Sequence, residues 1–207
     1  MSQLIVCQNS HGIILASDSK AAALDLSGAV RHLTVERMLQ LSAHTAILTG
    51  GAAEGIEMIA GLKNFLEEEG IDDIQEAYAA ALPFLATRFE TFMRKVCEVI
   101  PVDPIHHLYF ILGGYTGQDT QRPFRLYLLW TKKKRPQLDG DEILSVYTAP
   151  RVMGLEHKLD KLCQGDARLE DILPTVRKGM EDRARGDDEI GPPFRFAFIT
   201  RDGFKAC

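Results

Sequence analysis

The sequence predicts an α+β fold, in which antiparallel sheets are covered by pairs of helices. Three observations lead to this prediction. Short β-branched apolar runs bounded by turn residues open the chain, two long patterns with helical spacing follow, and the order of strands and then two helices is repeated. Hairpin-length loops between the strands favour antiparallel pairing over a parallel βαβ sheet. With 207 residues, 45% of them hydrophobic, and no linker or low-complexity segment, we expect a single domain over residues 1–207.

The first expected elements are four short strands in two hairpins. Residues 4–7 and 12–17 are apolar runs joined by an Asn-Ser-His-Gly turn signal. Residues 37–41 and 45–49 form a second pair. This pair ends abruptly at a Gly-Gly step that begins at Gly50, which predicts a junction between a strand and a helix.

Two helices are expected next. Apolar residues recur at helical spacing over residues 52–69, up to the stop signal Gly70. They do so again over residues 72–96, where two aspartates suit the N-terminal end of a helix and Pro83 lies inside the pattern. The remaining patterns predict, in order, strands at 107–112, 125–130 and 144–148, helices at 152–162 and 169–183, and a strand at 194–200 before a turn at 201–203.

Charge and hydropathy exclude two classes of partner. The formal net charge is -5, and the apolar runs are far shorter than the ~20 residues that span a bilayer. We therefore expect no nucleic-acid and no membrane partner. A basic run at residues 132–135 precedes Pro136 and an Asp139-Gly140 turn signal, so we favour a solvated hairpin loop over the alternative, a phosphate-binding patch for nucleic acid. No basic residue precedes the first apolar stretch, as a secretory signal would require, and we expect a cytoplasmic protein.

The cysteines and histidines predict no metal site. The four cysteines lie far apart without a C-x-x-C pair, so we expect reduced and mostly buried thiols. The six histidines show no ligand spacing, and the neighbours His106 and His107 would point in opposite directions on a strand. The chain also has no G-x-S-x-G, Walker A or G-x-G-x-x-G motif. We expect neither a metal nor a cofactor.

Ser2 is the candidate nucleophile that remains. It follows Met1 and leads directly into the first expected strand. A small second residue favours removal of the initiator methionine, which would leave Ser2 with a free α-amine beside its own hydroxyl. An α-amine has a pKa of ~8, so it can act as a base near neutral pH. Base and nucleophile would then come from one residue. A serine at position 2 is very common, however, and by itself is far more typical of an unstructured terminus than of a nucleophile.

Several segments beyond Ser2 carry a recognisable pattern. These segments are His-Gly-Ile-Ile-Leu-Ala-Ser-Asp-Ser-Lys-Ala at 11–21, Thr-Val-Glu-Arg-Met at 34–38, Thr-Gly-Gly-Ala-Ala-Glu at 49–54, Phe-Ile-Leu-Gly-Gly-Tyr at 110–115 and Phe-Ala-Phe-Ile-Thr-Arg-Asp-Gly-Phe at 196–204. They resemble proteasome β-type subunits and span most of the chain. The resemblance implies a four-layer αββα sandwich, two antiparallel sheets flanked by helix pairs, which is the N-terminal nucleophile hydrolase fold.

The resemblance also implies a set of catalytic residues. Ser2 falls on the family's N-terminal threonine nucleophile, and Asp18 falls on the aspartate that orients a lysine. Gly50 falls on the glycine whose backbone N–H stabilises the oxyanion. Read without the resemblance, Asp18 is a turn aspartate at a strand end, and the step at Gly50 is a turn into the helix.

The sequence departs from the family at three supporting positions. Arg37 stands where the family has its catalytic lysine, and an arginine, which stays protonated, can pair with Asp18 but cannot relay a proton. Residues 148–152 replace a Gly-Ser-Gly loop and bring no serine. Asp187 or Asp188 could supply the family's later aspartate, but residues 189–193 contain no serine. Proton transfer would therefore rest on the Ser2 amine.

Substrate and partners are also implied by the resemblance. Ala22, Leu48 and Ala52 match positions that shape the family's specificity pocket, which suggests a preference for apolar side chains. The family assembles into rings of six or seven subunits, and many members work with an AAA+ ATPase that feeds unfolded protein. The first strand starts close to Met1, as in β-type rather than α-type subunits. We thus expect self-association into rings, an AAA+ ATPase as a candidate partner, and a peptide or unfolded protein as substrate.

Two functions are consistent with these residues. The first is an amide-bond hydrolase, or peptidase, with Ser2 as its N-terminal nucleophile. The second is a ring or scaffold subunit that keeps the proteasome fold but is catalytically inactive, as the altered lysine and loop positions would permit. Fold alone does not decide between them.

Overall fold

The computed structural model describes residues 2–24, 30–99, 108–132 and 137–207. Their elements follow the predicted order of strands and paired helices. They are β1 (Leu4–Asn9), β2 (Gly12–Ser17), β3 (Lys20–Leu24), β4 (Val30–Thr34), β5 (Met38–Gln40), β6 (Thr45–Gly51), α1 (Glu54–Glu69), α2 (Ile74–Val99), β7 (Leu108–Tyr115), β8 (Phe124–Trp130), β9 (Asp139–Ile143), β10 (Val146–Ala149), α3 (Met153–Gln164), α4 (Leu169–Gly186), β11 (Arg195–Thr200) and β12 (Gly203–Ala206).

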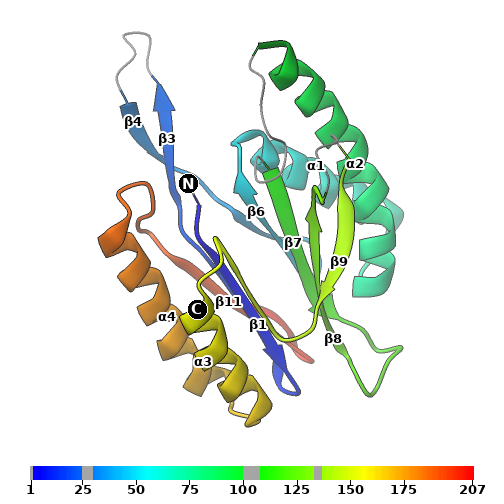
Figure 1. The fold of residues 1–207 in the computed structure, drawn as a ribbon. Helices are drawn as coiled ribbons and strands as arrows, with labels where there is room; N and C mark the ends of the chain where they lie inside the picture. The colour runs from blue at the N-terminus through cyan, green and yellow to red at the C-terminus, as the bar shows by residue number, and fades with distance from the viewer. Residues whose placement is uncertain (1, 25–29, 100–107, 133–136) are drawn as a thin grey trace.

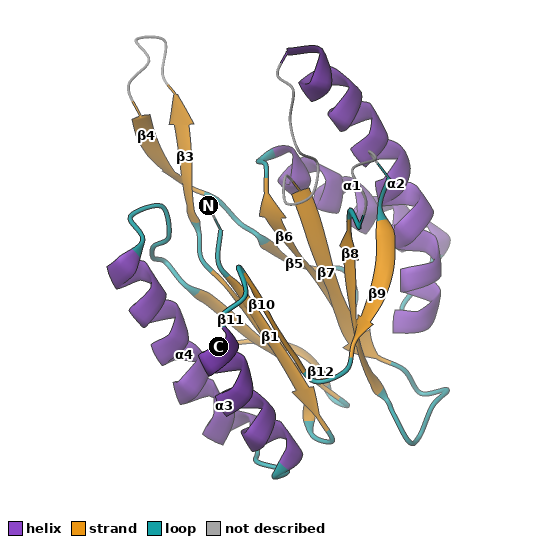
Figure 2. Ribbon diagram, viewed as in Figure 1, coloured by secondary structure: helices purple, strands orange, loops and turns teal. Residues whose placement is uncertain are grey.

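The strands form two five-stranded antiparallel sheets and a separate hairpin. Sheet I has the order β10-β1-β2-β11-β12, sheet II has the order β5-β6-β7-β8-β9, and β3 pairs with β4. The sheets stack face to face, with α3 and α4 outside sheet I and α1 and α2 outside sheet II (Figure 1). Figure 2 shows the resulting order of layers: helices, sheet, sheet, helices. The predicted α+β class and four-layer αββα sandwich are therefore confirmed.

Strand β1 is buried on both faces because it lies in an inner layer. Leu4 and Val6 belong to the cluster of apolar side chains between the two sheets. Ile5 and Cys7, which alternate with them, pack in the cluster beneath α3 and α4. A strand covered on both sides favours apolar residues on both faces, which explains why residues 4–7 form a continuous hydrophobic run.

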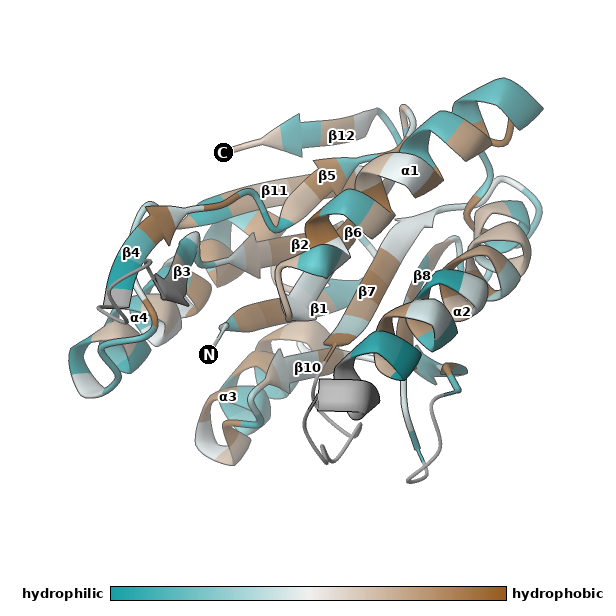
Figure 3. Cartoon of the chain, turned by 90° about the horizontal axis from the view of Figure 1, so that it is seen from above, coloured by the Kyte–Doolittle hydropathy of each residue, from teal (hydrophilic) through white to brown (hydrophobic). Residues whose placement is uncertain are grey.

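The helices bury one stripe each, as their spacing predicts. In α1, the stripe of Met58, Ile59, Leu62 and Leu66 packs toward sheet II, and Gly70 ends the helix in the left-handed conformation at φ 66°. The helices accordingly alternate hydrophobic and hydrophilic residues along their length (Figure 3). None of the helices in the described part of the chain has the length and apolar character that crossing a bilayer requires.

The expected turn at Asp139-Gly140 is wrong, because both residues lie in β9. Asp139 pairs with Trp130 and Gly140 with Leu129 across the β8–β9 ladder. A Cβ on Gly140 would lie 2.1 Å from the Tyr78 hydroxyl. This glycine therefore leaves room for a ring that packs over the strand.

The structure differs from the sequence patterns in a few elements, and part of the predicted features lies outside the described residues. The structure adds the β3–β4 hairpin, the acidic strand β9 and the short strand β12. Of the basic run at 132–135, only Lys132 lies within the described residues, and it forms an ion pair with Asp141. His106 and His107 lie outside the described residues.

Candidate active site

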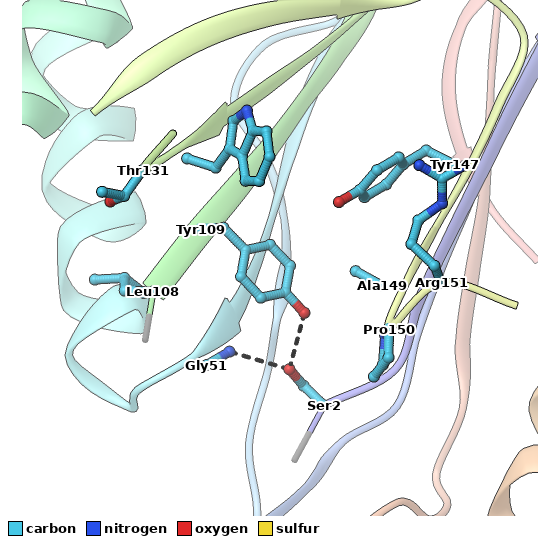
Figure 4. Close-up of a pocket in the computed structure, with 10 residues that line it drawn as sticks. Ser2, Gly51, Leu108, Tyr109, Thr131, Tyr147, Ala149, Pro150 and Arg151 are labelled. Carbon is cyan, nitrogen blue, oxygen red and sulfur yellow. Dashed lines mark hydrogen bonds between the residues drawn. The ribbon is translucent and has the colours of Figure 1, made fainter. Parts of the chain in front are cut away.

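Ser2 lies at the entrance of sheet I, two residues before β1, and its side chain reaches across to sheet II. The residue is 3% exposed. Its Oγ accepts a hydrogen bond from the backbone N–H of Gly51 at 3.0 Å and lies 3.4 Å from the Tyr109 hydroxyl (Figure 4). A terminal residue usually frays, so the burial of Ser2 between two sheets marks it as part of a built site.

Gly51 presents its N–H to Ser2 because the chain turns sharply there. It ends β6 and has a φ of 91°, a conformation that residues with a side chain rarely adopt. The chain then enters α1 within three residues. The Gly-Gly step thus forms the strand-to-helix junction that the sequence predicts, and it directs a backbone donor at the Ser2 oxygen.

Asp18 and Arg37 form a buried ion pair behind Ser2. Asp18 follows β2, and its carboxylate accepts hydrogen bonds from the N–H groups of Gln3 at 3.0 Å and Lys20 at 3.3 Å. The Nε of Arg37 lies 3.4 Å from Asp18 Oδ1, and its Nη2 donates to the Lys20 carbonyl at 3.0 Å. Because Gln3 follows Ser2 in the chain, the Gln3 bond ties the position of Ser2 to this pair.

Burial raises the pKa of Asp18 above its ordinary 3.8, although the Gln3 N–H and the charge of Arg37 act in the opposite direction. The residue is fully buried, at 0% exposure, and Arg37 is 3% exposed. The pair is therefore held away from water. In this buried position, each partner depends on the other for compensation of its charge.

Gly50, the expected oxyanion donor, faces an aromatic residue on the neighbouring strand. It lies in β6 directly opposite Tyr109 of β7. A Cβ at this position would lie 2.3 Å from the Cζ and hydroxyl atoms of Tyr109. The backbone donor that contacts Ser2 in this structure belongs to the next residue, Gly51.

A cavity of about 520 Å³ opens beside Ser2 between the two sheets. Its walls come from the ends of β7, β8 and β10, and most of them are aromatic or aliphatic. The lining residues are Ser2, Gly51, Leu108, Tyr109, Trp130, Thr131, Tyr147, Ala149, Pro150 and Arg151. The cavity thus offers an apolar chamber with a hydroxyl nucleophile in its wall (Figure 4).

Polar partners fix two of the larger side chains of this wall. Trp130 Nε1 donates to Asp141 at 2.8 Å. The Arg151 guanidinium makes two bonds to Glu156, at 2.7 and 2.6 Å. The charge of Arg151 is therefore compensated within the protein, which leaves the cavity without a free cation among these lining residues.

The residues expected to shape a specificity pocket are not among the residues that line this cavity. Leu48 is fully buried in the cluster between the sheets. Ala52 is partly buried and packs against the cluster beneath α1 and α2. Ala22 belongs to β3, where it pairs with His32, and its side chain lies outside the described residues. None of the three belongs to the cavity lining beside Ser2.

The two loops where the sequence departs from the family also lie around the site. Ala149 and Pro150 form part of the cavity wall, in the segment where the family has its serine loop. The loop after α4 reaches the Asp18 region, since Ser19 N–H donates to the Gly191 carbonyl at 3.4 Å. Asp187 points back along its own segment and accepts from the Glu189 N–H at 3.0 Å.

The sequence did not indicate the contact of the Gly51 N–H with Ser2, nor Tyr109, Trp130 and Tyr147 as cavity residues. Strand patterns contain these aromatic residues, but aromatic residues in a strand are equally typical of an ordinary core. Across the described ranges, no group of three histidine, cysteine, aspartate or glutamate side chains is placed to hold a metal ion.

Comparisons with known proteins found a match in three-dimensional structure only. No family model matches the sequence, and no curated protein matches it. The fold is similar to a solved structure described as an Anbu (Gly-1) mutant from Hyphomicrobium sp. strain MC1. The TM-score is 0.72 with 13% sequence identity, over 100% of this chain and 85% of that chain. Anbu has the proteasome-like N-terminal nucleophile hydrolase fold, and the likeness shows that this chain shares that fold.

Proposed function

We propose that the protein is an N-terminal nucleophile hydrolase that cleaves amide bonds with Ser2 after removal of Met1. One observation carries the proposal: the second residue of the chain is buried at an apolar cavity, with its Oγ hydrogen-bonded to a backbone N–H. This is the arrangement that attack on a carbonyl carbon needs, a nucleophile with a fixed donor next to it.

The proposed reaction proceeds through an ester on Ser2. The freed α-amine takes the hydroxyl proton, Oγ bonds to the carbonyl carbon, and the carbonyl π electrons move to oxygen, where the Gly51 N–H is placed to stabilise the charge. The C–N bond then breaks, and the leaving amine receives the proton from the α-ammonium. Water, deprotonated by the same amine, hydrolyses the ester and restores Ser2.

Asp18 and Arg37 act as positioning residues in this scheme. The Asp18 carboxylate accepts a hydrogen bond from the Gln3 N–H and so fixes the backbone that carries Ser2. Arg37 compensates the charge of Asp18 and adds positive potential to the region. Since arginine stays protonated, the proton path runs through the Ser2 amine alone.

A catalytically inactive ring or scaffold subunit is the alternative function. One observation favours it: Arg37 replaces the family's lysine and is held by Asp18 and the Lys20 carbonyl, as a purely structural residue would be. Under either function, self-association into rings belongs to the proposal. Sedimentation velocity of the purified protein tests this, since a sharp species of six or more subunits is expected and a monomer contradicts it.

The test of the hydrolase is an intact-mass measurement before and after incubation with a β-lactone or vinyl sulfone probe. Loss of Met1 and one adduct on Ser2 are expected. Ser2→Ala should remain unmodified, whereas Ser10→Ala, which removes an exposed serine in the β1–β2 turn, should react like the wild type. Retained Met1, or a trimmed Ser2 that never reacts, favours the inactive subunit.

A further inference from the structure

Tyr109 is the second polar group at the Ser2 oxygen. Its hydroxyl lies 3.4 Å from Ser2 Oγ, on the cavity side, while the Gly51 N–H approaches the same oxygen at 3.0 Å. Figure 4 shows the two groups converging on Ser2 from sheet II. Within the described part of the chain, Ser2 is the hydrogen-bond partner of this hydroxyl.

The position of the Tyr109 ring follows from the residue opposite it. Gly50 faces Tyr109 across the β6–β7 ladder, and the outer end of the ring occupies the space where a Cβ of residue 50 would lie. An aromatic ring that covers a cross-strand glycine fills the gap left by the missing side chain. Gly50 thus allows the ring to lie flat against β6 and brings its hydroxyl to Ser2.

The Tyr109 hydroxyl keeps its proton at neutral pH. Burial raises the pKa of Tyr109 to about 12, an effect to which Tyr147 adds and which the hydrogen bond with Ser2 opposes. The protonated hydroxyl is therefore able to donate a hydrogen bond, and it does not act as a base at this pH.

We propose that the Tyr109 hydroxyl and the Gly51 N–H together form the oxyanion hole of this site. The inference rests on the proposed hydrolase function and adds a catalytic residue to it. When Oγ bonds to the carbonyl carbon, the negative charge develops on an oxygen attached to that same carbon, within reach of donors that already face Oγ. Tyr109 donates a hydrogen bond to this oxygen and transfers no proton.

The distance in the structure is to Ser2 Oγ, and the oxyanion would lie beside Oγ on the carbon that it attacks. At 3.4 Å the contact between the two hydroxyls is longer than an ordinary O–H···O bond. Catalytic hydrogen bonds are often long in a free enzyme and shorten when charge develops in the reacting complex. A donor of this kind contributes to the transition state more than to substrate binding.

The experiment is the rate of Ser2 acylation by the β-lactone probe in Tyr109→Phe, followed by intact mass at several probe concentrations. Phenylalanine keeps the ring over Gly50 and removes only the hydroxyl. We expect the saturating rate to fall about 100-fold, the usual effect of losing one oxyanion donor, while the half-saturating concentration of the probe stays unchanged. The pH midpoint of the reaction should not move, because the α-amine remains the base.

Tyr127→Phe is the matched control. Tyr127 belongs to the neighbouring strand β8, but its ring stacks on Tyr78 beneath α2, on the other face of sheet II. Its loss of a hydroxyl should leave the acylation rate and its pH profile at the wild-type values. Thermal unfolding of both variants checks that the fold is retained.

The outcomes separate this inference from the proposed function. If the wild type does not react at Ser2, the hydrolase proposal is refuted and this inference falls with it. If the wild type reacts and Tyr109→Phe reacts equally fast, only the inference is overturned. The inference is also overturned if Tyr109→Phe changes only the half-saturating concentration of the probe, or if Tyr127→Phe slows acylation as much as Tyr109→Phe does. Packing would then explain the effect.

Discussion

Removing the charge of Arg37 should destabilise the protein strongly, and more so at alkaline than at acidic pH. Methionine at this position keeps a chain of similar length but leaves the buried Asp18 carboxylate without its cation. Breaking a buried ion pair by removal of one partner costs about 3–5 kcal/mol. The N–H groups of Gln3 and Lys20 still compensate part of the Asp18 charge, so we expect a loss of about 3 kcal/mol.

The pH dependence follows from the raised pKa of Asp18. A folded-state pKa above the unfolded 3.8 means that the folded protein binds more protons between the two values. Stability therefore falls as pH rises through that window and stays flat above it. Arg37 is one of the influences that lower this pKa. Its removal extends the window to higher pH, at a cost of about 1.4 kcal/mol for each further unit.

The assay is urea unfolding of Arg37→Met at pH 5 and pH 8, compared with wild type. The difference in unfolding free energy should be smaller at pH 5, which lies nearer than pH 8 to the range in which the folded protein takes up a proton at Asp18. A double variant that also carries Asp18→Asn should recover much of the loss, because replacing both partners removes the uncompensated charge. The reasoning is refuted if Arg37→Met loses under about 1 kcal/mol, or loses equally at both pH values.

Three further predictions concern other parts of the molecule. Glu156→Gln should cost about 1–3 kcal/mol in urea unfolding at pH 7, because Arg151 loses its charged acceptor. Burial opposes the charge of Glu156, but its hydrogen bonds outweigh this and lower its pKa below 4.5, so the cost should vanish as pH falls through that lowered value. Gly50→Ala should displace the Tyr109 ring, cost about 1–3 kcal/mol and slow Ser2 acylation, whereas unaltered acylation would contradict the packing argument. Phe89→Ala empties a fully buried site in α2, so the urea midpoint should drop by the equivalent of about 3–5 kcal/mol with an unchanged m-value.

The sequence predicts the inner strands well because burial on both faces leaves an unmistakable signal. Residues 4–7 and 13–16 are apolar at every position, and the short length of each run and the turn residues that bound it favour a strand over a helix. Strand β9, by contrast, reads Asp-Gly-Asp-Glu-Ile, a composition that strands usually avoid. It is held by its ladder with β8 and by the Trp130–Asp141 hydrogen bond, and both depend on tertiary contacts.

The candidate site likewise contains residues that the sequence could identify and one that it could not. Ser2, Asp18 and Arg37 could be named because they stand at set positions around two recognisable segments, and the structure brings Asp18 and Arg37 together beside the chain that carries Ser2. Tyr109 could not be named. Its place beside Ser2 depends on the register that sets it opposite Gly50, and a strand pattern gives the faces of residues but not their partners across the sheet.

The entry of the chain into β1 has a practical consequence for any work with this protein. Strand β1 pairs with neighbours on both sides, so the residues ahead of it cannot leave along a free edge. Ser2 itself lines the cavity, so an affinity tag or fusion partner joined to its amine would block that amine. The opposite end is suited to attachment, because β12 is the outermost strand of sheet I and its last residues are exposed.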